Sequence, residues 1–188
     1  MALPTPASRK LIHKRTVECC GYERNDGMWD IEGHIIDVKT HDFVNEDRGE
    51  IKPGEPVHDM WIRLTIDLDF KIHAVEARTV HSPYHACGEV VENYKVLIGE
   101  TIKAGWTQRT RQLLGGTKGC THLVELLGPV ATTAFQALYP ARERRTPTGS
   151  DGKRPPLIDT CHAWSATGAV VMRRHPTFYS GDKKAGAG

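Results

Sequence analysis

Residues 58–67 alternate almost without exception between apolar and polar side chains, which is the pattern of a β-strand buried on one face. A turn at Leu68-Asp69 predicts a strand that returns over residues 70–79, with Ile72 and Ala74 on one face. An antiparallel pair with one apolar face needs a second layer to cover that face, and this need restricts the fold more than any other feature. The buried face is predicted to carry Met60, Ile62, Leu64 and Ile66.

Another hairpin is predicted before this one. Residues 15–24 and 28–39 both have the pattern of strands, and Asn25-Asp26-Gly27 between them tolerates the positive φ that tight turns need. Residues 40–56 are polar and contain several glycines and prolines, so they predict a long loop. The two hairpins together predict an antiparallel sheet of about four strands.

The second half of the chain changes to helical periodicity. Residues 88–98 and 106–114 predict helices, and Gly99 is expected to end the first of them. The long apolar run that follows is predicted to kink or restart at Pro129 and to end at Pro140. Its buried stripe consists of Leu123, Leu126, Leu127, Val130, Ala134 and Leu138. The fold class is therefore predicted to be α+β, with the helices packed on one face of the sheet.

The organisation along the chain is predicted to be one domain with flanking segments. Residues 1–14 form a flexible leader, and residues 15–140 form a single α+β domain. Residues 141–156 form a linker loop, residues 157–179 a C-terminal segment that docks on the domain, and residues 180–188 a disordered tail.

Charge and composition exclude several classes of protein. A formal net charge of +2, with scattered basic residues, gives no case for nucleic-acid binding. No apolar run is long enough to cross a membrane, and residues 1–14 lack the apolar core of a signal peptide. Five cysteines without a C-x-x-C pair predict reduced thiols and a cytoplasmic protein. The expected partner is a small-molecule substrate, and a homo-oligomer is left open.

Three short segments combine residues that can carry chemistry. Cys120, His122 and Glu125 stand at the start of the long apolar helix, where residues 122 and 125 share one face. Each of these residues alone is readily explained as a buried or hydrogen-bonded structural group. For the cluster, a reactive site and a structural role are both open. The other two segments are Tyr84-His85-Ala86-Cys87 and Cys161-His162.

The polar face of residues 58–67 is a second candidate. Asp59, Trp61 and Arg63 point outward together, and an aromatic wall beside a guanidinium suits a ring that carries a carboxylate. The alternative is an ordinary solvated sheet face with cross-strand charge pairs. Trp61 weakens that alternative, because a pocket between the sheet and the helices would use it. Further predicted substrate-binding residues are Trp29 and Arg78.

These side chains suit acid–base chemistry on a small molecule. His122 with Glu125, or Tyr84 with His81, is predicted to exchange protons with the substrate. Cys120 is a further catalytic candidate, although a thiol there suits packing better than nucleophilic attack. No dinucleotide, phosphate-loop or zinc-protease motif occurs, so no cofactor is predicted.

Four segments carry a resemblance to a known family, and they are residues 22–33, 54–64, 113–123 and 159–163. On these segments the chain resembles the DUF2889 family, over about residues 14–180. The resemblance implies a bacterial, cytoplasmic protein and an association with catabolic gene neighbourhoods for aromatic and steroid compounds. The leading prediction is therefore a cofactor-independent lyase that acts on an aromatic, carboxylate-bearing catabolic substrate.

A weaker, topological similarity is to the iron–sulfur scaffold proteins of the NifU/IscU type. Those proteins place one cysteine after the last strand and another at the start of a late helix, where this chain has Cys87 and Cys120. Their third cysteine lies in the first hairpin turn, where this chain has Asp26 and no thiol. The implied alternative is a metal-binding or sulfur-handling protein with zinc or an iron–sulfur centre. A third alternative is a non-catalytic ligand-binding protein. The ligands in the metal alternative would be Cys87, Cys120, His122 and Cys161.

Overall fold

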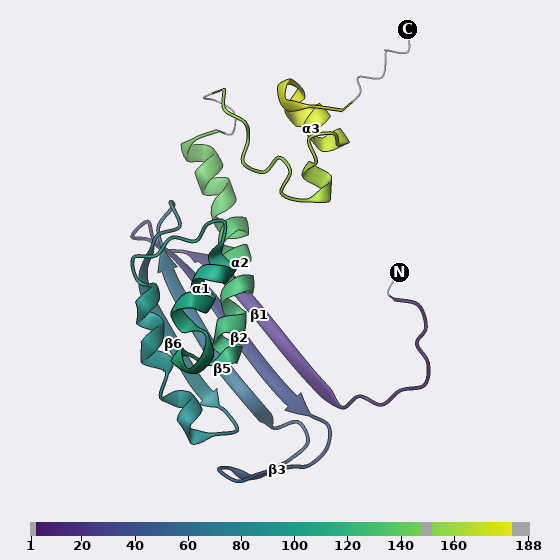
Figure 1. Cartoon of the computed structure of the whole chain (residues 1–188), viewed down its shortest axis with the longest axis vertical. Helices are drawn as coiled ribbons and strands as arrows, with labels where there is room; N and C mark the ends of the chain where they lie inside the picture. Colours follow the sequence, from purple (N-terminus) through teal and green to yellow (C-terminus); the bar gives the residue numbers. More distant parts are fainter. Residues whose placement is uncertain (1–2, 148–151, 182–188) are drawn as a thin grey trace. The chain divides into compact units, whose positions relative to one another are not determined.

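A four-stranded antiparallel sheet forms the body of the protein, in the strand order β1-β2-β5-β6. The computed structural model describes residues 3–147 and 152–181 (Figure 1). The sheet consists of the two predicted hairpins placed side by side, so the predicted α+β class and strand number are confirmed. The strands are β1 (His13–Glu23), β2 (Trp29–Lys39), β5 (Pro56–Ile66) and β6 (Ile72–His81).

The segment between β2 and β5 is more ordered than the predicted loop over residues 40–56. It contains a small hairpin of β3 (Phe43–Asn45) and β4 (Gly49–Ile51). The side-chain oxygen of Asn45 accepts hydrogen bonds from the backbone N–H groups of residues 47 and 48, which closes the turn. Arg48 then donates to the carbonyls of Pro56 and Val57, so the hairpin is tied to the start of β5.

The helices over residues 106–114 and 121–145 follow β6 and lie on one face of the sheet (Figure 1). Two short 3-10 segments replace the predicted α-helix over residues 88–98. The long helix begins at residue 121, continues through Pro140 and ends at Arg145, so it occupies the first part of the predicted linker. Its last residues, Ala-Arg-Glu-Arg-Arg, are strong helix formers, which explains the extension. The elements are η1 (His85–Gly88), η2 (Val91–Leu97), α1 (Trp106–Leu114), η3 (Gly116–Lys118) and α2 (Thr121–Arg145).

A second compact unit comprises residues 140–188. Within it, the Asp159 carboxylate accepts a hydrogen bond from the backbone N–H of Ala166 and pairs with Arg154, while Ile158 and Val171 are buried. Its elements are η4 (His162–Trp164), α3 (Ala169–Arg174) and η5 (Pro176–Phe178). The docking of residues 157–179 stays a prediction, and most of the predicted tail lies outside the described residues. At the other end, β1 takes up the last two residues of the predicted leader.

The core lies between the sheet and α2. Both predicted apolar faces are confirmed, since the inward side chains of β5 and the apolar stripe of α2 are buried. A bulge between β5 and β6 changes the expected pattern of β6: Ile72 and Val75 are both buried, whereas Ala74 faces outward. The same bulge places Glu76 and Arg78 on the open face of the sheet, opposite Arg63 and Trp61.

Glycine allows α2 to approach the sheet closely. A Cβ atom on Gly33 of β2 would lie 2.6 Å from Cγ2 of Val130, and one on Gly21 of β1 would lie 2.6 Å from Cβ of Ala137. These contacts are shorter than any side chain tolerates without displacement of the helix. The two glycines therefore set the position of α2 over β1 and β2.

We predict that Gly33→Ala lowers the free energy of unfolding by about 1–3 kcal/mol, because the added methyl group overpacks the interface. The matched control is Gly128→Ala in α2, where an added Cβ meets no atom within 4 Å. That change should be neutral or stabilise by up to about 1 kcal/mol through helix propensity. Urea denaturation of the three proteins gives the comparison, and equal stabilities of Gly33→Ala and wild type would contradict the close packing.

Candidate active site

The buried carboxylate of Asp37 lies near the end of β2. Residues at odd positions of β2, from Trp29 to Ile35, face the core, and Asp37 continues this series with no exposed surface. Arg15 of β1 and His58 of β5 are its direct neighbours in register on the two adjacent strands. An ionised carboxylate in this position requires charged or hydrogen-bonding partners, because burial alone disfavours its charge.

Three side chains supply those partners. Arg15 donates from Nε to Oδ1 and from a terminal nitrogen to Oδ2 of Asp37, at 2.8 Å each. The imidazoles of His13 and His58 contact Oδ1 and Oδ2, at 3.0 Å each. Burial would raise the pKa of Asp37, but the hydrogen bonds and charge of Arg15 outweigh it and lower this pKa to about 2. Asp37 is therefore ionised at neutral pH.

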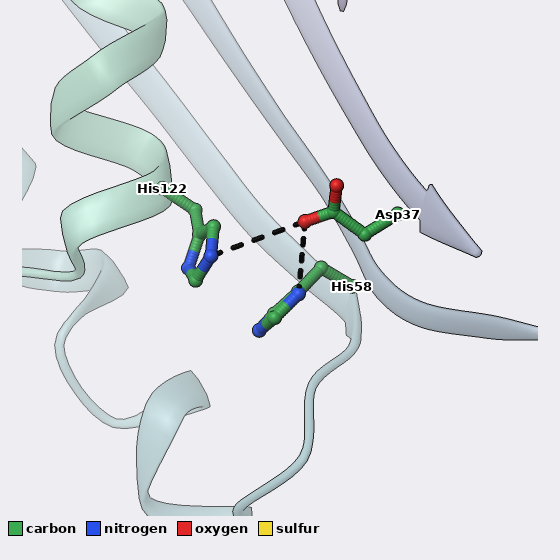
Figure 2. Close-up of side chains that lie close together, drawn as sticks. All are labelled: Asp37, His58 and His122. Atoms are coloured by element: carbon green, nitrogen blue, oxygen red, sulfur yellow. Dashed lines mark hydrogen bonds and ion pairs between the residues drawn. The ribbon is translucent and has the colours of Figure 1, made fainter. Parts of the chain in front are cut away.

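His122 in the first turn of α2 completes the cluster. Its ring lies 3.8 Å from the ring of His58, centroid to centroid, and its Nε2 lies 3.9 Å from Oδ2 of Asp37. Figure 2 shows the two imidazoles and the carboxylate directed toward one another. Burial, followed by the charge of His122, lowers the pKa of His58 to about 4, and burial also lowers the pKa of His122. Both imidazoles are therefore neutral at pH 7.

Cys120 and Glu125 border the cluster in different ways. Sγ of Cys120 lies 3.8 Å from Nδ1 of His122 and 3.6 Å from the sulfur of Met60. Glu125 accepts a hydrogen bond of 2.7 Å from Arg15, the same guanidinium that holds Asp37. The three residues predicted at the start of the long helix are thus near one another, but Glu125 is paired with Arg15 and not with His122 among the hydrogen bonds of the described residues.

A separate cluster lies on the open face of the sheet. Trp61 stacks on His34 with ring centroids 3.6 Å apart and planes 13° apart. Asp59 contacts Nε2 of His34 at 2.9 Å and Nδ1 of His81 at 3.7 Å. Arg63 nearby pairs with Glu32 and Glu76. This face thus brings together the predicted residues Asp59, Trp61, Arg63, Arg78 and His81.

The two clusters cannot form the single pocket that the sequence suggests. Trp61 is 40% exposed on the open face, whereas Trp29 is buried in the core on the opposite face. These two tryptophans therefore do not wall one cavity between sheet and helices. Tyr84 is exposed in the segment after β6, and His81 faces Asp59. The catalytic roles assigned to these residues stay predictions.

The predicted metal ligands come from separate parts of the chain. Cys87 lies in η1 and Cys161 in the second unit. Within the described ranges, 3–147 and 152–181, one group of His, Cys, Asp and Glu side chains has ligand atoms close enough for a metal ion. It consists of Asp37, His58 and His122, whose atoms lie within 4.8 Å of one another.

The residues around the buried carboxylate, His13, Arg15, Asp37, His58 and His122, form what we call the inner cluster. Sequence reasoning missed four of them: His13, Arg15, Asp37 and His58. A signal for two of them was present, because Asp37 continues the core-facing positions of β2 and His58 those of β5. An acid and an imidazole at the ends of two apolar faces indicate a buried polar pair. Arg15 and His13 could be found only after the register between β1 and β2 was known.

A comparison with protein-family models matches residues 13–136 to a family described as "Protein of unknown function (DUF2889)". The matched segment includes every residue of the inner cluster. No curated protein and no solved structure matches the chain, so the similarity to NifU/IscU-type scaffolds has no support. No helix in the described part of the chain is both long and apolar enough to cross a membrane.

The lowered pKa of His58 predicts a pH dependence of stability. Between pH 6.5 and about 4 the unfolded chain binds a proton at His58 and the folded protein does not, so the free energy of unfolding falls as the pH falls through this window. Over this window we expect the free energy of unfolding to fall less in His58→Gln than in wild type, by roughly 1–3 kcal/mol, because the glutamine amide does not titrate. Urea titrations at several pH values measure this, and parallel pH profiles of the two proteins would contradict it.

Proposed function

The chain belongs to the DUF2889 family, and on this premise we propose that it is a small-molecule enzyme whose proton-transfer groups are His58 and His122. The observation that carries the proposal is the hydrogen bond between His58 and the buried, ionised Asp37, with the tilted ring of a second imidazole 3.8 Å from that of His58, centroid to centroid. A histidine oriented by a carboxylate is a recurring arrangement for general acid–base catalysis.

His58 is the proposed base. When the Nδ1–H of His58 donates a hydrogen bond to Asp37, the lone pair of Nε2 is free to accept a proton from the substrate. Asp37 then stabilises the imidazolium that forms, and Arg15 keeps Asp37 ionised and in place. The neighbouring His122 disfavours a lasting positive charge on His58, which makes the protonated ring a good donor for the return step.

A carboxylate-bearing substrate suits this cluster. A negative charge close to the two imidazoles raises the pKa of both rings toward neutral pH, where acid–base catalysis is most efficient. The rings are reachable, since the side chains of His58 and His122 are 15% and 23% exposed. A lyase reaction that begins by removing a proton from the substrate uses a base and an acid of this kind. We propose an aromatic carboxylate as the substrate class.

A groove between α1 and α2 offers room for the rest of such a molecule. Its volume is about 450 Å³, and its walls include Thr107, Arg111 and Val124 together with several glycines. Glu125 belongs both to this groove and to the inner cluster, through its bond to Arg15. The lining of the groove thus includes Thr121 and Glu125, on either side of His122 in the sequence, but neither imidazole.

The test is turnover of a panel of small aromatic and aliphatic carboxylic acids, followed by mass spectrometry in the presence of a chelator. For an acid that wild type consumes, His58→Gln and His122→Gln should lower kcat by about 100-fold or more, because each removes a proton-transfer group. His34→Gln is the matched control, since His34 also bonds to an aspartate but on the open face of the sheet.

Wild-type turnover in both His58→Gln and His122→Gln would overturn the proposal. Loss of all wild-type turnover on chelation would overturn its metal-free form. A loss confined to His34→Gln or Trp61→Ala would move the reaction to the open face of the sheet.

A further inference from the structure

Asp37, His58 and His122 also have the composition of a metal centre, and we infer that they bind one divalent transition-metal ion of the zinc class. Two imidazoles and one carboxylate, from three different elements, are a common ligand set for such ions. This inference goes beyond the proposed function, because it assigns to these residues a ligand that acid–base catalysis by the two imidazoles does not require.

The distances between the ligand atoms fit a common centre. With bonds of about 2.1 Å in a tetrahedral site, neighbouring ligand atoms lie roughly 3.4 Å apart. Oδ2 of Asp37 lies 3.0 Å from Nδ1 of His58 and 3.9 Å from Nε2 of His122, so the two distances bracket this value. Small side-chain rotations would equalise them without moving the backbone. Three protein ligands leave a fourth position open to solvent or substrate.

The surroundings orient the ligands in the way that metal sites require. Nδ1 of His122 lies 3.8 Å from Sγ of Cys120. When the proton of His122 is on Nδ1, Nε2 carries the lone pair, and Nε2 is the nitrogen that faces Asp37. Arg15 holds both carboxylate oxygens of Asp37 and His13 contacts Oδ1, so the carboxylate is fixed in orientation and Oδ2, the oxygen that also faces His58, would bind the ion beside the guanidinium. Ligating carboxylates and imidazoles are normally supported by such outer hydrogen bonds.

The local charge favours a cation despite the nearby arginine. Arg15 forms ion pairs with both Asp37 and Glu125, so these three groups carry a formal charge of −1 together. The ion would replace the proton between His58 and Asp37. That proton moves from Nδ1 to Nε2 of His58, so a neutral imidazole becomes the ligand and no proton is lost.

The test uses the full chain, stripped with a chelator and titrated without substrate with Co²⁺, followed by visible absorption, and with Zn²⁺, followed by calorimetry. We expect one equivalent of either ion to bind to wild type. His58→Ala and His122→Ala should each bind at least about 10-fold more weakly, because each removes a direct ligand. His34→Ala on the open face is the matched control and should bind like wild type. Zn²⁺ should also raise the thermal midpoint of wild type and leave that of His122→Ala unchanged.

Absence of one-to-one binding by wild type would overturn the metal site. So would wild-type affinity in both His58→Ala and His122→Ala, or an equal loss in His34→Ala. Circular dichroism of each variant before titration shows that it is folded. Because binding is measured without substrate, absence of binding overturns the metal site alone, whereas wild-type turnover in His58→Gln and His122→Gln overturns the acid–base proposal alone.

Discussion

The burial of an ionised carboxylate at the end of β2 is the constraint on which the rest of this structure depends. Asp37 is tolerable in the core only because Arg15 and His58 lie beside it on the two adjacent strands. Arg15 in turn reaches Glu125, so the same guanidinium joins the sheet to α2. The charge network therefore fixes the register of three strands and the place of one helix at a single point.

Close packing against the sheet and α1 positions the rest of α2. Gly21 and Gly33 let α2 lie directly on β1 and β2, and Trp106 donates to the carbonyl of Leu127 from the side of α1. With the axis held in this way, the first turn of α2 brings His122 to Asp37. The polar cluster thus depends on apolar contacts several turns away.

Features set by residues close together in the sequence could be predicted from it. Features that depend on the pairing of distant segments could not. The strict alternation around Met60 and Leu64 specifies which face of β5 is buried, because side chains alternate along any strand. The bulge at His73, between Ile72 and Ala74, depends on the pairing of two strands, so the residue pattern of β6 alone does not predict it. Likewise, His122 was recognisable as a candidate, whereas its partners lie far away along the chain and meet it only through the sheet register.

His58 and Asp59 are consecutive, yet they serve the two faces of the sheet, one beside Asp37 and the other beside His34. Deletion or insertion of a single residue inside β5 would exchange their faces: Asp59 would face α2, and His58 would face the open side of the sheet. During divergence, then, changes of chain length should accumulate in the β3–β4 hairpin, while the number of residues from His58 to Ile66 is held constant.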